Sequence, residues 1–355
     1  MEEIAELISH RFVRAEPRRR VVAYMEGLLS HAQRKNAFAL ASHAREVGPD
    51  GMQRLLRTAK WDPHAVRDDL RTYVMRHTRE EGSDGVLVVS PEVFVKKGRH
   101  SAGVAWQYSS RHGRMQNCQI GLFLGHVSAR GAGIVDRELY LPREWLDRGT
   151  PGIVHGVPEG SGYTAKAGLS RRMIARALES GLRSPWVSVP DDDLWDEELR
   201  TWLDGLNVPY VLRLRPDDAA ALAPRGTAGE PLRAPGRRGS GPGLNTLPWQ
   251  TVRLRRTSGE RALWLLTHHP APSERPASFL CSGPAGTAIP EFIRAVRAQA
   301  TARRCLDALR SDAGLHEYQV RTVTGWYRHT TLSLLAHAFR SFAPGGRPRA
   351  VDVPA

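Results

Sequence analysis

The chain has 355 residues, 41% of them hydrophobic, and no apolar run approaches the 18 or so residues that a membrane helix requires. Its 51 basic residues include five lysines, which leaves 46 arginines, and they outnumber 37 acidic residues to give a formal net charge of +14. The composition excludes a membrane-embedded protein. The charge favours a polyanionic partner, because released counterions drive the binding of basic proteins to phosphates.

The N-terminus and the cysteines indicate the compartment. The segment MEEIAELISH (1–10) is acidic and amphipathic, whereas a secretory leader is cationic and then apolar. Cys118, Cys281 and Cys305 are far apart and form no CxxC pair, so the sequence predicts neither a disulfide framework nor a zinc site. We therefore expect a cytoplasmic protein whose cysteines are small buried residues.

Residues 1–82 predict a helical domain. Apolar residues recur at helical spacing, and Pro17, Gly48 with Pro49, and Pro63 divide the segment into short helices. The segment also carries clustered basic side chains, namely Arg18, Arg19, Arg20, Arg34 and Lys35. A helical domain that binds DNA fits this pattern. The alternative is a set of solvated helix faces packed on the next domain.

Residues 83–215 predict the first part of a mixed-sheet core. Strand-like segments rich in β-branched and aromatic residues are 86–89, 102–108, 119–127, 133–141, 186–189 and 209–214. Amphipathic helices are predicted at 168–180, 195–206 and, much later, 290–310. Adjacent strands followed by helix, strand, helix, strand and a late helix match the order of a ribonuclease H-like fold. The fold class is therefore α+β.

The remaining residues predict an insertion and a C-terminal completion of the core. Within 216–285, residues 216–248 are rich in Pro, Gly and Arg and predict a mobile linker, and 251–256 and 261–269 predict a small β insertion. Residues 286–345 predict helices that complete the core, and 346–355 a disordered tail. His329 and His337 are eight residues apart, about 12 Å along a helix, so we expect structural or solvent-facing side chains and no shared metal ion.

Several motifs resemble bacterial insertion-sequence transposases of the DDE type. In that group a Lys-Lys-Gly, a Gln-Tyr-Ser and an Asn-Cys-Gln-x-Gly follow the first catalytic strand, and all three occur in this order within 93–131. Further matching pieces are EPRRR (16–20), GMQRLL (51–56), WDPHAVRDDLR (61–71), DRELYLPREW (136–145), GLHEYQVR (314–321) and GWYRHTTLSLLAHAF (325–339). The resemblance covers most of the chain and implies a ribonuclease H-like core that acts on DNA.

The resemblance also implies three metal-binding carboxylates, and this chain has none of them at the matching positions. Two aspartates and a glutamate hold divalent ions about 3.5–4 Å apart in such enzymes. The first aspartate follows a strand in a pattern like VLVVDETGFxKKG, where this chain reads VLVVSPEVFVKKG and has Ser90. The second follows a tryptophan by four residues, where this chain has Pro190. The glutamate lies on the last helix, where this chain has Arg303, and Gln299 and Arg310 take the places of a flanking arginine and lysine.

Three neighbouring acids are weak candidates for rescuing the chemistry. Glu92 is two residues past Ser90 and faces the same side of a strand, about 6.6 Å further along. Asp191 follows Pro190, and Asp307 is one helical turn, about 6 Å, past Arg303. Magnesium requires oxygens at about 2.0–2.1 Å, so three such displacements disfavour a two-ion site. We expect the acidic run 191–193 to cap the next helix instead.

The resemblance and the charge together predict a DNA-binding protein without catalytic acids. Lys96, Lys97 and Arg99 form a basic hairpin that would meet a phosphate backbone or, alternatively, a solvated turn, and Arg303 and Arg310 could hold a phosphate. We expect double-stranded DNA as partner, with insertion-sequence terminal repeats and a homo-oligomer as further possibilities, nucleoid association and no cofactor. The alternative is a working transposase that uses Mg²⁺ for strand cleavage and transfer.

Overall fold

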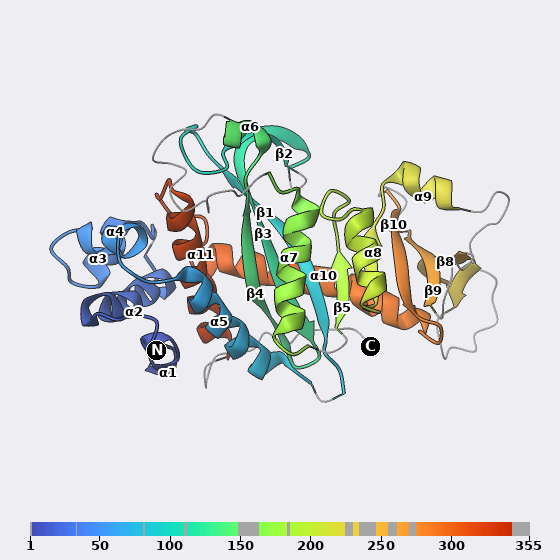
Figure 1. The fold of residues 1–355 in the computed structure, drawn as a ribbon, viewed down its shortest axis with the longest axis horizontal. Coiled ribbons are helices and arrows are strands. Elements are labelled where there is room, and N and C mark those ends of the chain that lie inside the picture. The colour runs from blue at the N-terminus through green and yellow to red at the C-terminus, as the bar shows by residue number, and fades with distance from the viewer. Residues whose placement is uncertain are drawn as a thin grey trace.

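The computed structural model describes residues 2–32, 34–80, 82–109, 112–147, 163–182, 185–223, 230–233, 246–254, 261–269 and 275–342. Within these ranges one mixed sheet forms the centre of the molecule (Figure 1). Its strands are β1 Val86–Val95, β2 Ala105–Ser109, β3 Arg114–Ser128, β4 Gly131–Tyr140, β5 Trp186–Val189, β6 Tyr210–Arg213, β7 Glu230–Arg233, β8 Thr246–Leu254, β9 Arg261–His268 and β10 Ala277–Pro284. The strand order is β2-β3-β1-β5-β6-β10-β9-β8-β7, and β4 pairs with β3.

The pairing pattern is that of a ribonuclease H-like core. β1 is antiparallel to β3, with Ser90 opposite Phe123, and parallel to β5, with Val88 opposite Ser188. β5 and β6 are also parallel. The predicted α+β fold class and the order of its core elements are therefore confirmed, and β5 has the predicted bounds.

Helices cover both faces of this sheet. They are α1 Glu2–Ser9, α2 Ala15–Leu29, α3 Ala37–His43, α4 Asp50–Arg57, α5 Pro63–Thr78, α6 Arg143–Asp147, α7 Lys166–Glu179, α8 Glu197–Gly205, α9 Pro216–Leu222, α10 Ile289–Asp312 and α11 Val323–Phe342. Figure 1 shows α7 and α8 on the near face of the sheet and α10 on the far face. None of the described helices is long and apolar enough to cross a membrane.

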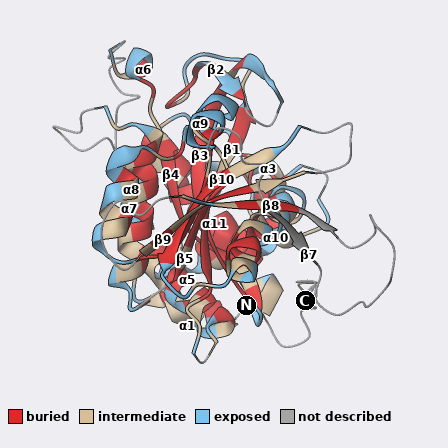
Figure 2. Cartoon of the chain, turned by 90° about the vertical axis from the view of Figure 1, so that its right-hand side faces the viewer, coloured by how far each residue is buried: buried red, intermediate tan, exposed pale blue. Residues whose placement is uncertain are grey.

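Strand alternation divides the core into two layers. Leu87 and Val89 pack in one cluster with α7, whereas Val88 packs in the other with Ala298 and Ala302 of α10. Most of α11 is buried as well, and Figure 2 shows it at the centre of the molecule. Each face of the central strands is therefore covered by a helix, and β1 faces α10 through Val88 and the residues that alternate with it.

The N-terminal helices belong to the same hydrophobic core as the sheet. α5 packs on β4 and α11, and residues of α1 to α5 form one continuous cluster with residues of β1, β3 and β4. A buried carboxylate strengthens this contact: Asp136 on β4 receives Arg67 and Arg71 of α5 at 3.1 Å each and Arg176 of α7 at 2.9 Å. The helical region is thereby held on the core in one orientation.

The prediction of a mobile linker at 216–248 is wrong in part, because regular elements occupy some of it. Residues Pro216–Leu222 form α9, and Glu230–Arg233 form β7, which pairs with β8. Residues 224–229 and 234–245, and the predicted tail 346–355, lie outside the described residues. The β insertion is not a separate sheet, because β10 pairs with β6 from Phe279 opposite Arg213 to Ser282 opposite Tyr210. Backbone hydrogen bonding therefore extends the core sheet through the insertion.

The two histidines of α11 were predicted to be structural or solvent-facing, and burial decides for the structural role. His329 is fully buried, with Nδ1 2.8 Å from the Tyr24 hydroxyl oxygen, and His337 is also buried. Burial lowers the pKa of each imidazole to about 4. Both therefore stay neutral in the native state at pH values where a free histidine is protonated.

We predict that the protein loses stability as the pH falls from about 6.5 towards 4. In this window the unfolded chain binds protons that the native chain excludes, so the free energy of unfolding decreases with falling pH, by roughly 3 kcal/mol per buried histidine when fully developed. Calorimetric melting temperatures should show this fall, and a smaller fall in His337→Leu. The exposed His31 provides the control His31→Leu, which should keep the wild-type slope. A slope in His337→Leu as steep as wild type would contradict the prediction.

Candidate functional site

The carboxyl-terminal half of β1 extends past its parallel neighbour. β5 pairs only with Val86 to Val88 and ends at Val189, so Ser90 and Pro190 lie at matching positions where the two strands separate. Pro91 lies inside β1, opposite Leu122, rather than at a strand terminus. A proline is tolerated there because β1 has lost its neighbour on one side. Ser90 and Glu92, which alternate with Pro91, are both buried.

Helix α10 brings its side chains to this end of β1 and β5. The Gln299 amide donates to the Ser188 hydroxyl at 2.9 Å, and one turn later Arg303 donates to the Pro91 carbonyl at 3.5 Å. The helix can lie this close because Gly125 on β3 has no side chain, and a Cβ there would be 3.2 Å from that of Ala302. Ser90, Pro190 and Arg303, which the sequence resemblance matches to the acids of DDE-type transposases, therefore lie at one end of the sheet, with Arg303 of the helix facing the strands.

A buried ion pair occupies this end of the sheet. The Glu92 carboxylate is fully buried; its Oε2 is 3.0 Å from Nη2 of Arg303, and its Oε1 is 2.8 Å from Nε2 of His316. The same Nη2 lies 3.2 Å from Asp307 one turn along α10. The His316 ring is 4.5 Å from that of Phe94, which fixes its position. Arg303 is thus held between Glu92 and Asp307, two of the three candidate rescue acids.

The acidic run after β5 does not cap the next helix. α8 begins at Glu197, and its N-cap is Asp196, which accepts the backbone N–H of Leu199 at 2.8 Å. Asp192 pairs with Arg215 at 2.9 Å, and Asp193 pairs with Lys166. The prediction of a capping role was wrong because the helix starts several residues later, which leaves the run in a turn where ion pairs hold it. Asp191 lies in the same turn, and its carbonyl accepts the N–H of Leu194 at 3.3 Å.

These residues do not fit a pair of divalent ions. The three corresponding positions offer a hydroxyl, a proline ring and a guanidinium, and the neighbouring carboxylates of Glu92 and Asp307 contact the guanidinium. Two-metal chemistry requires several carboxylate oxygens directed at ions about 3.5–4 Å apart. In the described part of the chain, no group of three His, Cys, Asp or Glu side chains could hold a metal ion.

The predicted DNA-binding residues differ in how accessible they are. Arg18, Arg19, Arg34, Lys97, Arg99 and Arg310 are exposed. Arg20 pairs with Glu16 and with Glu46 at 2.8 Å, which partly satisfies its charge. Lys35 is buried, and its ammonium donates to the Asp312 carbonyl at 2.7 Å. The prediction that Lys35 contacts DNA is therefore corrected, because its charge is used inside the protein.

Lys96 is a special case among the basic residues that follow β1. They do not form the predicted hairpin, because β1 and β2 each pair with β3 and not with each other. Its ammonium lies 3.8 Å above the centre of the Tyr318 ring, and burial lowers its pKa to about 8. Lys97 and Arg99 follow it and are exposed. A phosphate backbone can thus reach Lys97 and Arg99 directly, whereas Lys96 contributes a partly enclosed charge.

Sequence reasoning missed two features of this region. His316, the second partner of Glu92, is 224 residues away in the chain, and its only signal was its place in the GLHEY motif. A set of arginines on α5, α10 and the turn between β3 and β4 was missed as well. On α10 the spacing of Arg294, Arg297 and Arg304 would have revealed a shared helix face.

The chain matches a known family over most of its length. The family model of the DDE superfamily endonuclease matches residues 8–271, so the chain belongs to this family. Ser90 and Pro190 lie within the matched residues, and Arg303 lies beyond them. No curated protein matches the chain.

We predict that Glu92 and Arg303 are energetically coupled. Arg303→Met leaves the Glu92 carboxylate buried without its arginine partner, and should cost about 1–3 kcal/mol, less than a fully buried pair because Arg303 is a third exposed. Glu92→Gln/Arg303→Met should cost clearly less than the sum of its two single variants. Urea unfolding measures these differences. Arg310→Met, at an exposed position of the same helix, should be nearly neutral, and strict additivity of the two site variants would refute the coupling.

Proposed function

We propose that this member of the DDE superfamily endonuclease family binds DNA and does not cut it. The observation that carries the proposal is the ion pair of Arg303 with the buried Glu92, in the region where the family's acids would hold metal ions. Two-metal catalysis instead needs carboxylates that are free to coordinate the metal ions acting on the reacting phosphate.

Electrostatics supports the loss of metal chemistry. A guanidinium about 4 Å from a divalent ion would repel it by about 8 kcal/mol at an effective dielectric constant of 20. Glu92 could coordinate an ion only by leaving both Arg303 and His316, and Asp307 only by leaving Arg303. The candidate rescue acids are therefore engaged with protein cations, which disfavours the alternative of a working transposase.

The charge distribution supports DNA binding. The net charge is +14, and the exposed basic side chains include Arg18 and Arg19 on α2, Arg34, and Lys97 and Arg99 after β1. Backbone phosphates are the natural partner of such surfaces, and contacts to them need no metal ion. The role we propose is occupancy of DNA on the nucleoid, with insertion-sequence terminal repeats as the candidate target and a homo-oligomer as the candidate assembly.

We predict that the wild-type protein does not nick supercoiled plasmid or its candidate terminal repeats in Mg²⁺ or Mn²⁺. Ser90→Asp/Pro190→Asp/Arg303→Glu replaces the three positions with acids, so it should gain a Mn²⁺-dependent rise in melting temperature and some nicking. Scanning calorimetry and agarose gels measure both. Wild-type cleavage that Glu92→Gln abolishes would overturn the proposal in favour of a working transposase.

We also predict steeply salt-dependent binding to duplex DNA. With about four phosphate contacts, affinity should fall roughly a hundred-fold between about 50 and 200 mM NaCl. Lys97→Gln/Arg99→Gln should lower the slope by about 2 in fluorescence anisotropy titrations. The matched control is Arg172→Gln/Arg275→Gln, which removes two exposed arginines on α7 and before β10. Absent or salt-insensitive binding by the wild type would refute the DNA-binding function.

A further inference from the structure

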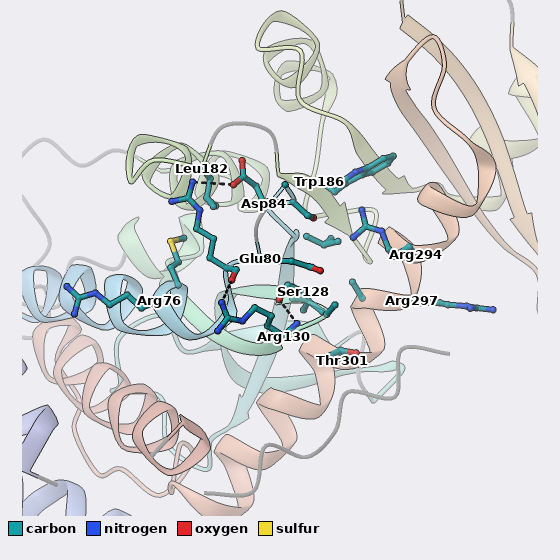
Figure 3. Close-up of a pocket in the computed structure, with 18 of the residues that line it drawn as sticks. Arg76, Glu80, Asp84, Ser128, Arg130, Leu182, Trp186, Arg294, Arg297 and Thr301 are labelled. Atoms are coloured by element: carbon teal, nitrogen blue, oxygen red, sulfur yellow. Dashed lines mark hydrogen bonds and ion pairs between the residues drawn. The ribbon is translucent and has the colours of Figure 1, made fainter. Parts of the chain in front are cut away.

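A large groove opens at the other end of the central strands. It has a volume of about 1580 Å³, and Val86 and Trp186, the first residues of β1 and β5, line it (Figure 3). Ser90 lies four residues further along β1, about 13 Å away in an extended strand. The groove is therefore separate from the site that contains Glu92 and Arg303.

Arginines from three parts of the chain line this groove, which we call the arginine groove. They are Arg76 on α5, Arg79 just after it, Arg130 in the turn between β3 and β4, and Arg294, Arg297 and Arg304 on α10. The lining contains three acids, of which Asp84 lies 3.6 Å from Arg79 and Glu291 2.8 Å from Arg294. Six guanidinium groups thus face three carboxylates, and the groove carries a net positive charge.

Three of these guanidinium groups pair with no carboxylate of the described residues. Arg130 donates to the Arg79 carbonyl at 3.0 Å, and Arg304 donates to the Thr301 hydroxyl at 2.9 Å. Across the described residues, Arg76, Arg130 and Arg304 form no ion pair with a carboxylate. All three are exposed. Their charges are therefore available to an external anion.

The arrangement has the length of a nucleic-acid contact. On α10, Arg294 and Arg304 are ten residues apart, about 15 Å along the axis. One DNA strand advances about 3.4 Å per nucleotide, so this distance spans about four nucleotides. Figure 3 shows Arg130 towards the middle of the groove, with Arg76 and Arg297 at its margins on α5 and α10. Cations thus occur along the whole width of the groove.

Size favours a polymer over a small ligand. Pockets for small molecules enclose roughly 300–1,000 Å³, and the arginine groove is larger, at about 1580 Å³. Guanidinium groups bind phosphate oxygens through paired hydrogen bonds, and backbone contacts position DNA without reading its sequence.

We infer that the arginine groove binds the sugar–phosphate backbone of duplex DNA as a second contact surface, distant from the Glu92–Arg303 site. This inference rests on the proposed DNA-binding function.

Charge removal in the arginine groove tests the inference. Arg130→Gln/Arg304→Gln removes two exposed guanidinium groups from different walls of the groove. The control Arg172→Gln/Arg275→Gln removes two exposed arginines elsewhere and has the same net charge. Anisotropy titrations of the full chain with a labelled duplex of arbitrary sequence measure affinity against salt. At physiological salt the groove variant should bind roughly 10- to 30-fold more weakly, with a salt slope lower by about 2, while the control changes less than about 3-fold. Arg130→Lys/Arg304→Lys should retain most of the affinity, because it retains the charge.

The outcomes separate the two proposals. A wild type that shows no salt-dependent binding refutes the DNA-binding function itself. A wild type that binds, with groove and control variants of equal affinity and slope, refutes only the arginine groove. A parallel titration with poly-glutamate tests whether the arginine groove binds acidic protein segments instead. If the groove variant loses affinity for poly-glutamate and keeps its affinity for DNA, the arginine groove binds acidic protein segments, and the inference is overturned.

Discussion

The ion pairs around the buried carboxylate of Asp136 are the interaction on which the arrangement of the molecule depends. Burial by itself would raise the pKa of this group, but the guanidinium groups of Arg176 and Arg67 outweigh that effect and hold the pKa below its usual value. Removing one partner of such a network is costly, since it leaves a buried charge uncompensated. Because those arginines lie on α5 and α7, the ion pairs hold both helices against β4. The relative positions of α5, α7 and β4 therefore depend on these ion pairs.

Helix α10 connects the two regions to which we assign function. Successive residues of a helix point about 100° apart, so Arg303 and Arg304 face different surroundings. Arg303 contacts Glu92 at the carboxyl-terminal half of β1, and Arg304 lines the arginine groove at the other end of that strand. One helix therefore carries both Arg303, which contacts the buried Glu92 carboxylate, and part of the surface that we infer binds phosphates. Our two proposals are consistent with each other, since contacts between arginines and phosphates need no metal ion.

The sequence predicted regular elements well where the local pattern was strong. The β5 segment, bounded by tryptophan and proline, and the amphipathic α7 were found within two residues of their observed ends. The strand Ala277–Pro284 was missed, because its small and polar residues show no alternation, and it forms through pairing with β6 and β9. The burial of Lys35 could not be predicted either. It lies in a basic cluster along the chain, and only the contact with Asp312, 277 residues away, removes it from the surface.

The sequence by itself determined the family, the order of the core elements, the positive charge, and the resemblance that matches Ser90, Pro190 and Arg303 to the acids of DDE-type transposases. These properties depend on residue identity and local spacing, which can be read directly from the chain. Only the tertiary structure decided that Glu92 is held by Arg303 and His316, which of the basic side chains remain exposed, and that arginines from α5, a turn and α10 line one groove. Burial and ion pairing depend on contacts between residues far apart in sequence, so they were settled only when the chain folded.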